Sequence, residues 1–412
     1  MQSSIFPDSD KLQSGLEAAL FSSGIAKRSV SVLDRKQNPF SSTFPTEIVT
    51  CRIDLSSNTQ TLFVKYGKAS FDGVFKHRGN VSYEAKVYRN VLRPLKTSAP
   101  NFYGVYRDKR THTDWLIIEY IPGGHRASWT RDPQAMIRSA RWIGRFHAAN
   151  ERRISGSRLR FLRRYDFSYY VGWARRTSQF FNHRSKQLQA RFPWIPHLCE
   201  EFEESLPSLM EAPRTVIHGE CFGSNIVYQN GISHPIDWQS AAVAPGEIDL
   251  ASLTLAWPKH FVEKLEREYE KSRWPIRTPY EFRESLDIAR LYMGFRWLGD
   301  TRLMSHWFRP GKRFVIPKDP KRIITELYTV GQRLGMIQDT GDRADSLASI
   351  IDATLTPNGE KCRLPSTKIR FSHLCEAKHV RKGSSKYAED RSSPRKIQDP
   401  SGVARLRTDI FS

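Results

Sequence analysis

The sequence has few cysteines, no long apolar run and fewer acidic than basic residues. Its five cysteines, among 412 residues, are scattered and odd in number. This argues against a disulfide framework or a zinc site and suits a reducing compartment. No apolar run approaches the roughly 20 residues that a membrane-spanning helix needs. The opening segment M-Q-S-S-I-F-P-D-S-D lacks the basic and apolar regions of a signal peptide. We therefore expect a soluble, cytoplasmic protein.

The excess of basic residues is concentrated in two segments. The formal net charge is +22; residues 151–192 hold 11 Lys and Arg against two acids, and residues 361–412 hold 13 against five. One interpretation is a solvated basic surface and a disordered tail. The alternative is a surface for nucleic acid, anionic lipid or an anionic substrate. Because few aromatic residues interleave the tail, we do not favour a nucleic-acid module there.

A polar loop, His218–Asn225, lies between two short β-type runs and precedes a third apolar step that carries Asp237. The residues read V-I-H-G-E-C-F-G-S-N-I-V-Y and then P-I-D-W. Phosphoryl transfer from a magnesium nucleotide needs a group that orients the attacking hydroxyl and hard oxygen ligands for the metal. Glu220 and Asn225 have the spacing that separates the catalytic base of kinases from the metal-binding asparagine.

These motifs, H-G-E-x-x-x-x-N and I-D-W-Q, resemble those of the aminoglycoside phosphotransferase and choline kinase-like enzymes. The family patterns are H-G-D-x-x-x-x-N and I-D-[WF]-[ED], so Glu220 replaces the usual aspartate and Gln239 replaces a frequent acid. The resemblance implies an α+β, two-lobed protein-kinase-like fold, with a small antiparallel-sheet N-lobe and a larger, mostly helical C-lobe. It also implies ATP or another nucleoside triphosphate, Mg²⁺, and transfer of the γ-phosphoryl group to a hydroxyl.

The resemblance assigns a role to each motif residue. Glu220 is the expected base, and His218 is expected to fix the catalytic loop through hydrogen bonds. Asn225 belongs to the catalytic loop and, with Asp237, is an expected metal ligand. Asp249, in the sequence D-L-A, is expected to brace the loop from below; its alternative role is a first-turn acid that caps a helix.

The expected nucleotide site begins at Lys65, which closes the apolar strand T-L-F-V-K-Y. We expect this lysine to contact the α- and β-phosphates and to pair with Glu84 on the following helix. The alternatives are an ordinary edge-strand lysine and a solvated helix glutamate. The preceding loop, D-R-K-Q-N-P-F-S-S-T-F-P, has no glycine, so Ser41 and Ser42 are expected to donate hydrogen bonds to phosphate.

The segment L-I-I-E-Y-I-P-G-G resembles the family's hinge. The backbone of Glu119, Tyr120 and Ile121 is expected to receive the adenine. We predict an N-terminal helical extension at 1–28, a nucleotide-binding N-lobe at 29–121, a catalytic and substrate-binding C-lobe at 122–356, and a basic, disordered tail at 357–412.

The basic character of the substrate region predicts a neutral or anionic small-molecule acceptor, unless the acids of 200–204 line its pocket. We favour an O-phosphotransferase. Two alternatives are a catalytically silent kinase-fold protein that binds nucleotide or another ligand and, less favoured, a basic scaffold that binds nucleic acid. The departure at Glu220 and the glycine-free loop motivate the silent alternative.

Overall fold

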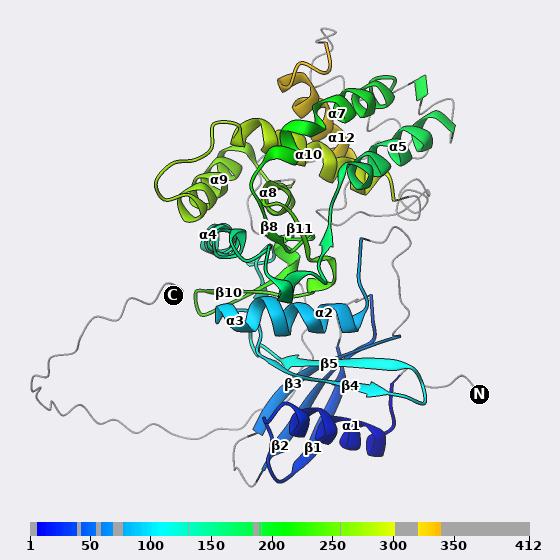
Figure 1. Ribbon diagram of the computed structural model, residues 1–412, viewed down its shortest axis with the longest axis vertical. Helices are drawn as coiled ribbons and strands as arrows, with labels where there is room; N and C mark the ends of the chain where they lie inside the picture. The colour runs from blue at the N-terminus through cyan, green and yellow to red at the C-terminus, as the bar shows by residue number, and fades with distance from the viewer. Residues whose placement is uncertain are drawn as a thin grey trace, which may run out of the picture. The chain divides into compact units, whose positions relative to one another are not determined.

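The computed structural model describes residues 6–38, 43–54, 59–68, 77–130, 132–183, 189–190, 192–255, 257–300 and 320–338 (Figure 1). The chain divides into two units, 1–360 and 361–412, and all described residues belong to the first. Ser41, Ser42 and the predicted basic tail lie outside the described residues.

The first part of the described chain is a five-stranded antiparallel sheet with the order β1-β2-β3-β5-β4. Its strands are β1 (Val30–Gln37), β2 (Thr46–Ile53), β3 (Thr59–Lys68), β4 (Phe102–Asp108) and β5 (Thr113–Glu119). Side chains alternate between the two faces of a strand, so neighbouring residues of β3 have different surroundings.

One face of the sheet is covered by helix α1 (Ser9–Ser22), whose buried side chains form a separate apolar cluster with Leu62 and Val64. Lys65 is directed to the opposite face, where helix α2 (Val81–Val87) packs against β5. Figure 1 shows α1 and α2 on opposite sides of the sheet. The alternation thus brings Lys65 toward α2, which carries Glu84.

Helix α2 starts where its sequence provides a cap. The side chain of Asn80 accepts a hydrogen bond from the backbone N–H of Tyr83 and so satisfies one of the free donors at the helix start. Helix α2 continues through the π-turn Tyr88–Leu92 into the short helix α3 (Arg93–Leu95).

The remainder of the described chain is mostly helical. Its helices are α4 (Gln134–Glu151), α5 (Phe167–His183), α7 (Trp194–Glu211), α8 (Glu247–Thr254), α9 (Lys259–Arg273), α10 (Phe282–Leu298) and α12 (Pro320–Arg333). Two small sheets complete it, in the orders β10-β9-β6 and β7-β11-β8. Their strands are β6 (His125–Arg126), β7 (Arg163–Arg164), β8 (Arg214–Ile217), β9 (Ile226–Gln229), β10 (Ile232–Pro235) and β11 (Ala242–Pro245). The predicted α+β architecture is confirmed.

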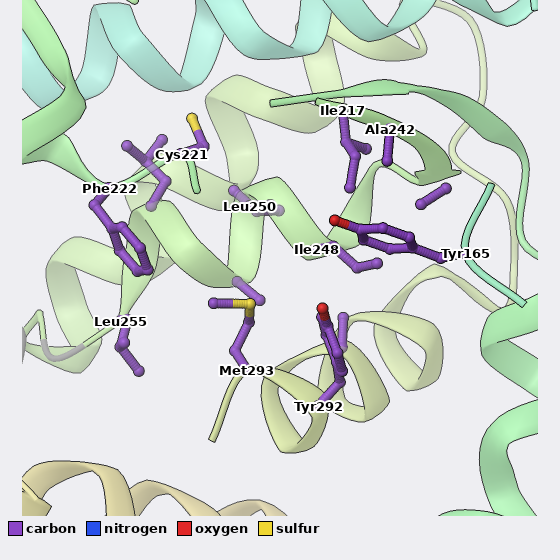
Figure 2. Packing of buried hydrophobic residues seen from close by; sticks show 14 of the residues in the cluster. Tyr165, Ile217, Cys221, Phe222, Ala242, Ile248, Leu250, Leu255, Tyr292 and Met293 are labelled. Carbon is purple, nitrogen blue, oxygen red and sulfur yellow. The ribbon is translucent and has the colours of Figure 1, made fainter. Parts of the chain in front are cut away.

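A buried apolar cluster supports the polar loop between β8 and β9. Cys221 and Phe222 directly follow Glu220 and belong to this cluster (Figure 2). Figure 2 shows them in the same packed region as Leu250 of α8 and Met293 of α10. Burial of the two loop residues fixes the position of the residue before them. Within the described part of the chain, no helix is long and apolar enough to cross a membrane.

Candidate active site

Lys65 lies between two carboxylates. Its Nζ atom is 2.8 Å from Glu84 Oε2 and 2.7 Å from Asp237 Oδ1, and both Lys65 and Glu84 are buried. Burial alone would lower the pKa of Lys65, but the charges of Asp237 and Glu84 outweigh burial and raise it, so the group stays an ammonium. The structure thus brings Lys65 of a strand and Glu84 of a helix together with Asp237 of a loop, which is 172 positions from Lys65 in the sequence.

Asp237 occupies an unusual backbone conformation directly after the β9–β10 hairpin. Its φ is 67° and its ψ is 55°, which is the left-handed region that side chains other than glycine rarely adopt. The backbone N–H of Trp238 donates to Glu84 Oε1 over 3.1 Å, so Glu84 holds both Lys65 and the turn that carries Asp237. The side chain of Asp237 is 29% exposed and therefore reachable by a ligand.

The loop that carries His218 and Glu220 is held from below by Asp249. The carboxylate of Asp249 accepts hydrogen bonds from the backbone N–H of His218 (2.6 Å) and of Gly219 (2.8 Å), and it lies 3.1 Å from Nε2 of the buried His147. The side chain of His218 is also engaged, since Nε2 donates to Ile236 O at 2.8 Å and Nδ1 accepts from Glu220 N at 3.3 Å. This geometry suits the loop-fixing roles predicted for His218 and Asp249, which stay predictions.

Gly219 allows this loop to approach the Asp237 turn closely. Its φ is +79°, and a Cβ atom there would lie 2.2 Å from the carbonyl oxygen of Ser240. Such an overlap with backbone is not relieved by a side-chain movement. The glycine of the H-G-E motif is therefore required for the close contact of the two loops.

The carboxylate of Glu220 is held by two arginines and a serine. It accepts hydrogen bonds from Arg78 Nη2 (2.7 Å), Arg296 Nη2 (2.8 Å) and Ser240 Oγ (3.0 Å), and from Arg78 Nε at 3.2 Å. Arg296 also donates to the carbonyl oxygen of Gly219. Burial would raise the pKa of Glu220, but the charges of Arg78 and Arg296 outweigh burial and hold it well below its usual range. Glu220 is thus the shared counter-ion of Arg78 and Arg296.

Two amide side chains, Asn225 and Gln239, lie on the segments next to Asp237; the backbone N–H of Ile236 donates to Asn225 O over 2.9 Å. Asn225 donates from Nδ2 to the carbonyl oxygen of Glu220 (2.9 Å), which leaves its Oδ1 as the amide atom for a ligand. Gln239 Oε1 is buried and, within the described chain, accepts no hydrogen bond, while Nε2 of the same side chain is 3.4 Å from Asp237 Oδ2. Carboxylate and amide oxygens are the donors that Mg²⁺ prefers, so the residues fit the metal that the resemblance implies.

The segment predicted to receive adenine begins at the last residue of β5, Glu119. The backbone N–H of Glu119 donates to Asn101 O (2.9 Å) and that of Tyr120 donates to Thr61 O (3.2 Å). Both N–H groups therefore serve the sheet. Among the described residues, no backbone carbonyl accepts a hydrogen bond from the N–H of Ile121. Of the three predicted residues, Ile121 is the one whose N–H is left for an adenine.

A small, open pocket borders Glu220. Its charged and polar walls include Arg78, Arg296 and His77, whose Nδ1 is buried and without a hydrogen-bond partner in the described chain. The remaining lining residues are Trp173, Glu220, Phe222, Met293, Trp297 and Asp300. Glu200, Glu201, Glu203 and Glu204 are not among the residues that line it.

The residues that surround Glu220 were not predicted from the sequence. Arg78 and Arg296 lie 142 and 76 positions from it in the sequence, so no local spacing relates them. The direct contact of Lys65 with Asp237 was also not predicted. One local feature of the sequence bears on Arg78. It stands two residues before Asn80, the residue that caps α2, so its position is fixed relative to the start of that helix.

Comparison with known proteins gave one family and several solved structures with a similar fold. The sequence model described as APH, phosphotransferase enzyme family, matches residues 77–282. The structure of a putative fructosamine-3-kinase from Thermobifida fusca YX-ER1 is 15% identical with a TM-score of 0.51, covering 79% of this chain and 99% of that one. The amicoumacin kinase hAmiN, solved with AMP-PNP, Ca²⁺ and Ami, is 11% identical with a TM-score of 0.51, covering 79% of this chain and 94% of that one. At these identities the likeness shows the fold alone, and it confirms the predicted kinase-like fold. No curated protein sequence matched.

Proposed function

Because the chain belongs to the phosphotransferase enzyme family, we propose that it transfers the γ-phosphoryl group of magnesium-bound ATP, or of another nucleoside triphosphate, to a hydroxyl of a small molecule. The observation that carries this proposal is the contact of Lys65 with both Glu84 and Asp237. A phosphate-binding lysine and a metal-binding carboxylate must lie in one site for this reaction. The amicoumacin kinase, whose fold is similar, was solved with a nucleotide analogue and a divalent ion.

Each residue of the site has a part in the proposed reaction. Lys65 binds the α- and β-phosphates and leaves Asp237 free for the metal. Asp237, Asn225 and Gln239 supply the oxygens that hold Mg²⁺, which neutralises charge on the phosphates when it is bound. Glu220 orients the attacking hydroxyl and accepts its proton late in the transfer.

The pocket beside Glu220 supports a neutral or anionic acceptor. The charges of Arg78 and Arg296 are matched by Glu220 and Asp300, and much of the remaining wall is aromatic. Because these four charges cancel, the pocket offers no net negative charge that would attract a cationic amine. A hydroxyl compound with an apolar portion and no positive charge is therefore the acceptor class that we propose.

One observation supports a second function, which is binding without turnover. In this structure, donors from Arg78, Arg296 and Ser240 occupy both oxygens of Glu220. A carboxylate in this state has no oxygen directed at a substrate hydroxyl. If this arrangement persists with nucleotide bound, the chain is a nucleotide-binding protein of the family that does not transfer phosphate.

A pair of assays separates the two functions. Thermal shift with Mg-ATP tests nucleotide binding, and ADP release in the presence of a panel of neutral, anionic and cationic hydroxyl compounds tests transfer. The key variant is Asp237→Ala. A matched control is Glu268→Ala, because Glu268 is similarly exposed and also pairs with one basic residue, Arg141. If the protein transfers phosphate, an acceptor should accelerate ADP release by the wild type and by Glu268→Ala but not by Asp237→Ala. A thermal shift with Mg-ATP but no ADP release would support binding alone.

A further inference from the structure

Arg78 lies on a segment that is tied to the active site at its backbone. The N–H of Gly79 donates to the carbonyl oxygen of Gln239 over 2.7 Å, so the segment is fixed to the turn that carries Asp237. A Cβ atom at Gly79 would lie 2.5 Å from the ring of Tyr83, so only glycine fits beside α2. The sequence Arg-Gly-Asn thus positions the arginine, contacts the Asp237 turn and caps α2.

The side chain of Arg78 contacts the predicted base, and the backbone of the next residue contacts the turn that carries the predicted metal ligand Asp237. Arg78 Nη2 is 2.7 Å from Glu220 Oε1. Burial would lower the pKa of Arg78, but the charge of Glu220 outweighs burial and raises it. Phosphoryl transfer places the moving group between a base-bound hydroxyl and a metal-bound triphosphate. Because Arg78 contacts the predicted base, we expect its guanidinium group to lie beside the phosphoryl group on which negative charge spreads during transfer.

Arg78 differs from the other two cations of the site in its freedom to move. Lys65 is buried between two carboxylates, and Arg296 has a 6% exposed side chain and also donates to Gly219 O. The side chain of Arg78 is 35% exposed. When Arg78 turns away, Glu220 keeps Arg296 and Ser240 as partners, so the carboxylate is not left as an unpaired buried charge.

We propose that Arg78 is a further catalytic residue, which exchanges Glu220 for the transferring phosphoryl group and stabilises its charge. This inference rests on the proposed phosphotransferase function. In the step, a bond forms between the acceptor oxygen and the γ-phosphorus, and the bond from that phosphorus to the bridging oxygen breaks. The bridging electron pair leaves with ADP, and the hydroxyl proton passes to Glu220. Arg78 forms no covalent bond; its guanidinium group donates hydrogen bonds to the non-bridging oxygens.

The test compares Arg78→Ala and Arg78→Lys with the wild type. A matched control is Arg35→Ala, because Arg35 forms a bidentate pair with the buried Glu47 and has a similarly exposed side chain. The measured quantities are kcat for ADP release, the affinity for Mg-ADP, and the affinity for Mg-ADP with aluminium fluoride, which mimics the transferring phosphoryl group. An arginine that acts on this group contributes about 10³-fold or more to kcat.

The expected result is a selective loss. Arg78→Ala should lower kcat by about 10³-fold and weaken the aluminium fluoride complex by about 100-fold or more, with Mg-ADP affinity kept within about threefold. Arg78→Lys should recover only part of this, since lysine lacks the planar fork. Arg35→Ala should behave like the wild type.

Three results would overturn the inference. If Arg78→Ala keeps the kcat of an active wild type, Arg78 is not catalytic and the proposed function stands. If Arg78→Ala weakens Mg-ADP and the aluminium fluoride complex equally, its role is structural. If the wild type neither binds Mg-ADP nor releases ADP from Mg-ATP, the proposed function fails and the inference fails with it. If Arg78→Ala does not fold, the kcat and the two affinities of Arg78→Lys are compared with those of the wild type instead.

Discussion

Because Glu220 pairs with two arginines, we expect the free energy of unfolding to depend on its charge. Replacing Glu220 by Gln removes the charge but keeps the size of the side chain. Arg296, with a 6% exposed side chain, then loses its carboxylate partner inside the protein. Breaking a buried ion pair by removing one partner costs about 3–5 kcal/mol. Arg78 is partly exposed and can turn to solvent, so its share is that of a surface pair, below about 1 kcal/mol.

We therefore expect Glu220→Gln to lower the free energy of unfolding by about 3–5 kcal/mol, measured by urea denaturation at neutral pH. The matched control is Glu203→Gln, which breaks an exposed pair with Arg175 and should cost at most about 1 kcal/mol. The double variant Glu220→Gln with Arg296→Met should recover part of the loss, because it removes the unpaired charge. A Glu220→Gln protein as stable as the control would refute the reasoning.

Three further predictions follow from the site geometry. Glu220→Asp restores the residue of the family motif, yet it should lower kcat, about 100-fold if the carboxylate is displaced by one methylene from its donors; steady-state ADP release measures this, and higher activity would contradict it. Gly219→Ala should cost more than about 2 kcal/mol in unfolding free energy because its Cβ overlaps Ser240 O, whereas Gly24→Ala, also at positive φ but in open space, should cost about 1 kcal/mol; equal losses would contradict it. Burial lowers the pKa of His77 to about 3, with Arg296 adding to the shift and Glu220 opposing it. The unfolded state therefore binds an extra proton below pH ~6.5, and stability falls with falling pH by up to ~1.4 kcal/mol per unit. His77→Gln should reduce the wild-type loss between pH 7 and pH 5 by ~2 kcal/mol in denaturation experiments; an unchanged loss would show that the buried imidazole is not the cause.

Local patterns in the sequence predicted elements of this site and one of its side-chain pairs. The apolar strand that ends at Lys65 and the helix that carries Glu84 follow from periodicity and order, and the structure places the two side chains 2.8 Å apart. The spacing of Glu220 and Asn225 places both in one loop, where a side-chain hydrogen bond from Asn225 to the carbonyl oxygen of Glu220 links them. Such features depend on residues that are close in sequence or on a known motif.

The surroundings of Glu220 were not predictable in the same way. Among many arginines in a chain with 65 basic residues, no pattern distinguishes Arg78 and Arg296 from those that face solvent. Their selection depends on how α10 and the start of α2 pack around the loop, which is a tertiary property. The contact of Lys65 with Asp237 likewise depends on the left-handed turn at Asp237, which the sequence P-I-D-W does not specify.

The most direct test of the phosphotransferase account is to follow the phosphoryl group itself by ³¹P NMR. The wild type and Asp237→Ala would be incubated with Mg-ATP and the acceptor that best accelerates ADP release, or with the pooled panel of hydroxyl compounds. The account predicts a new phosphomonoester signal that grows in step with ADP in the wild type and is absent in Asp237→Ala. Unchanged ATP, or inorganic phosphate as the sole product with every acceptor, would contradict it.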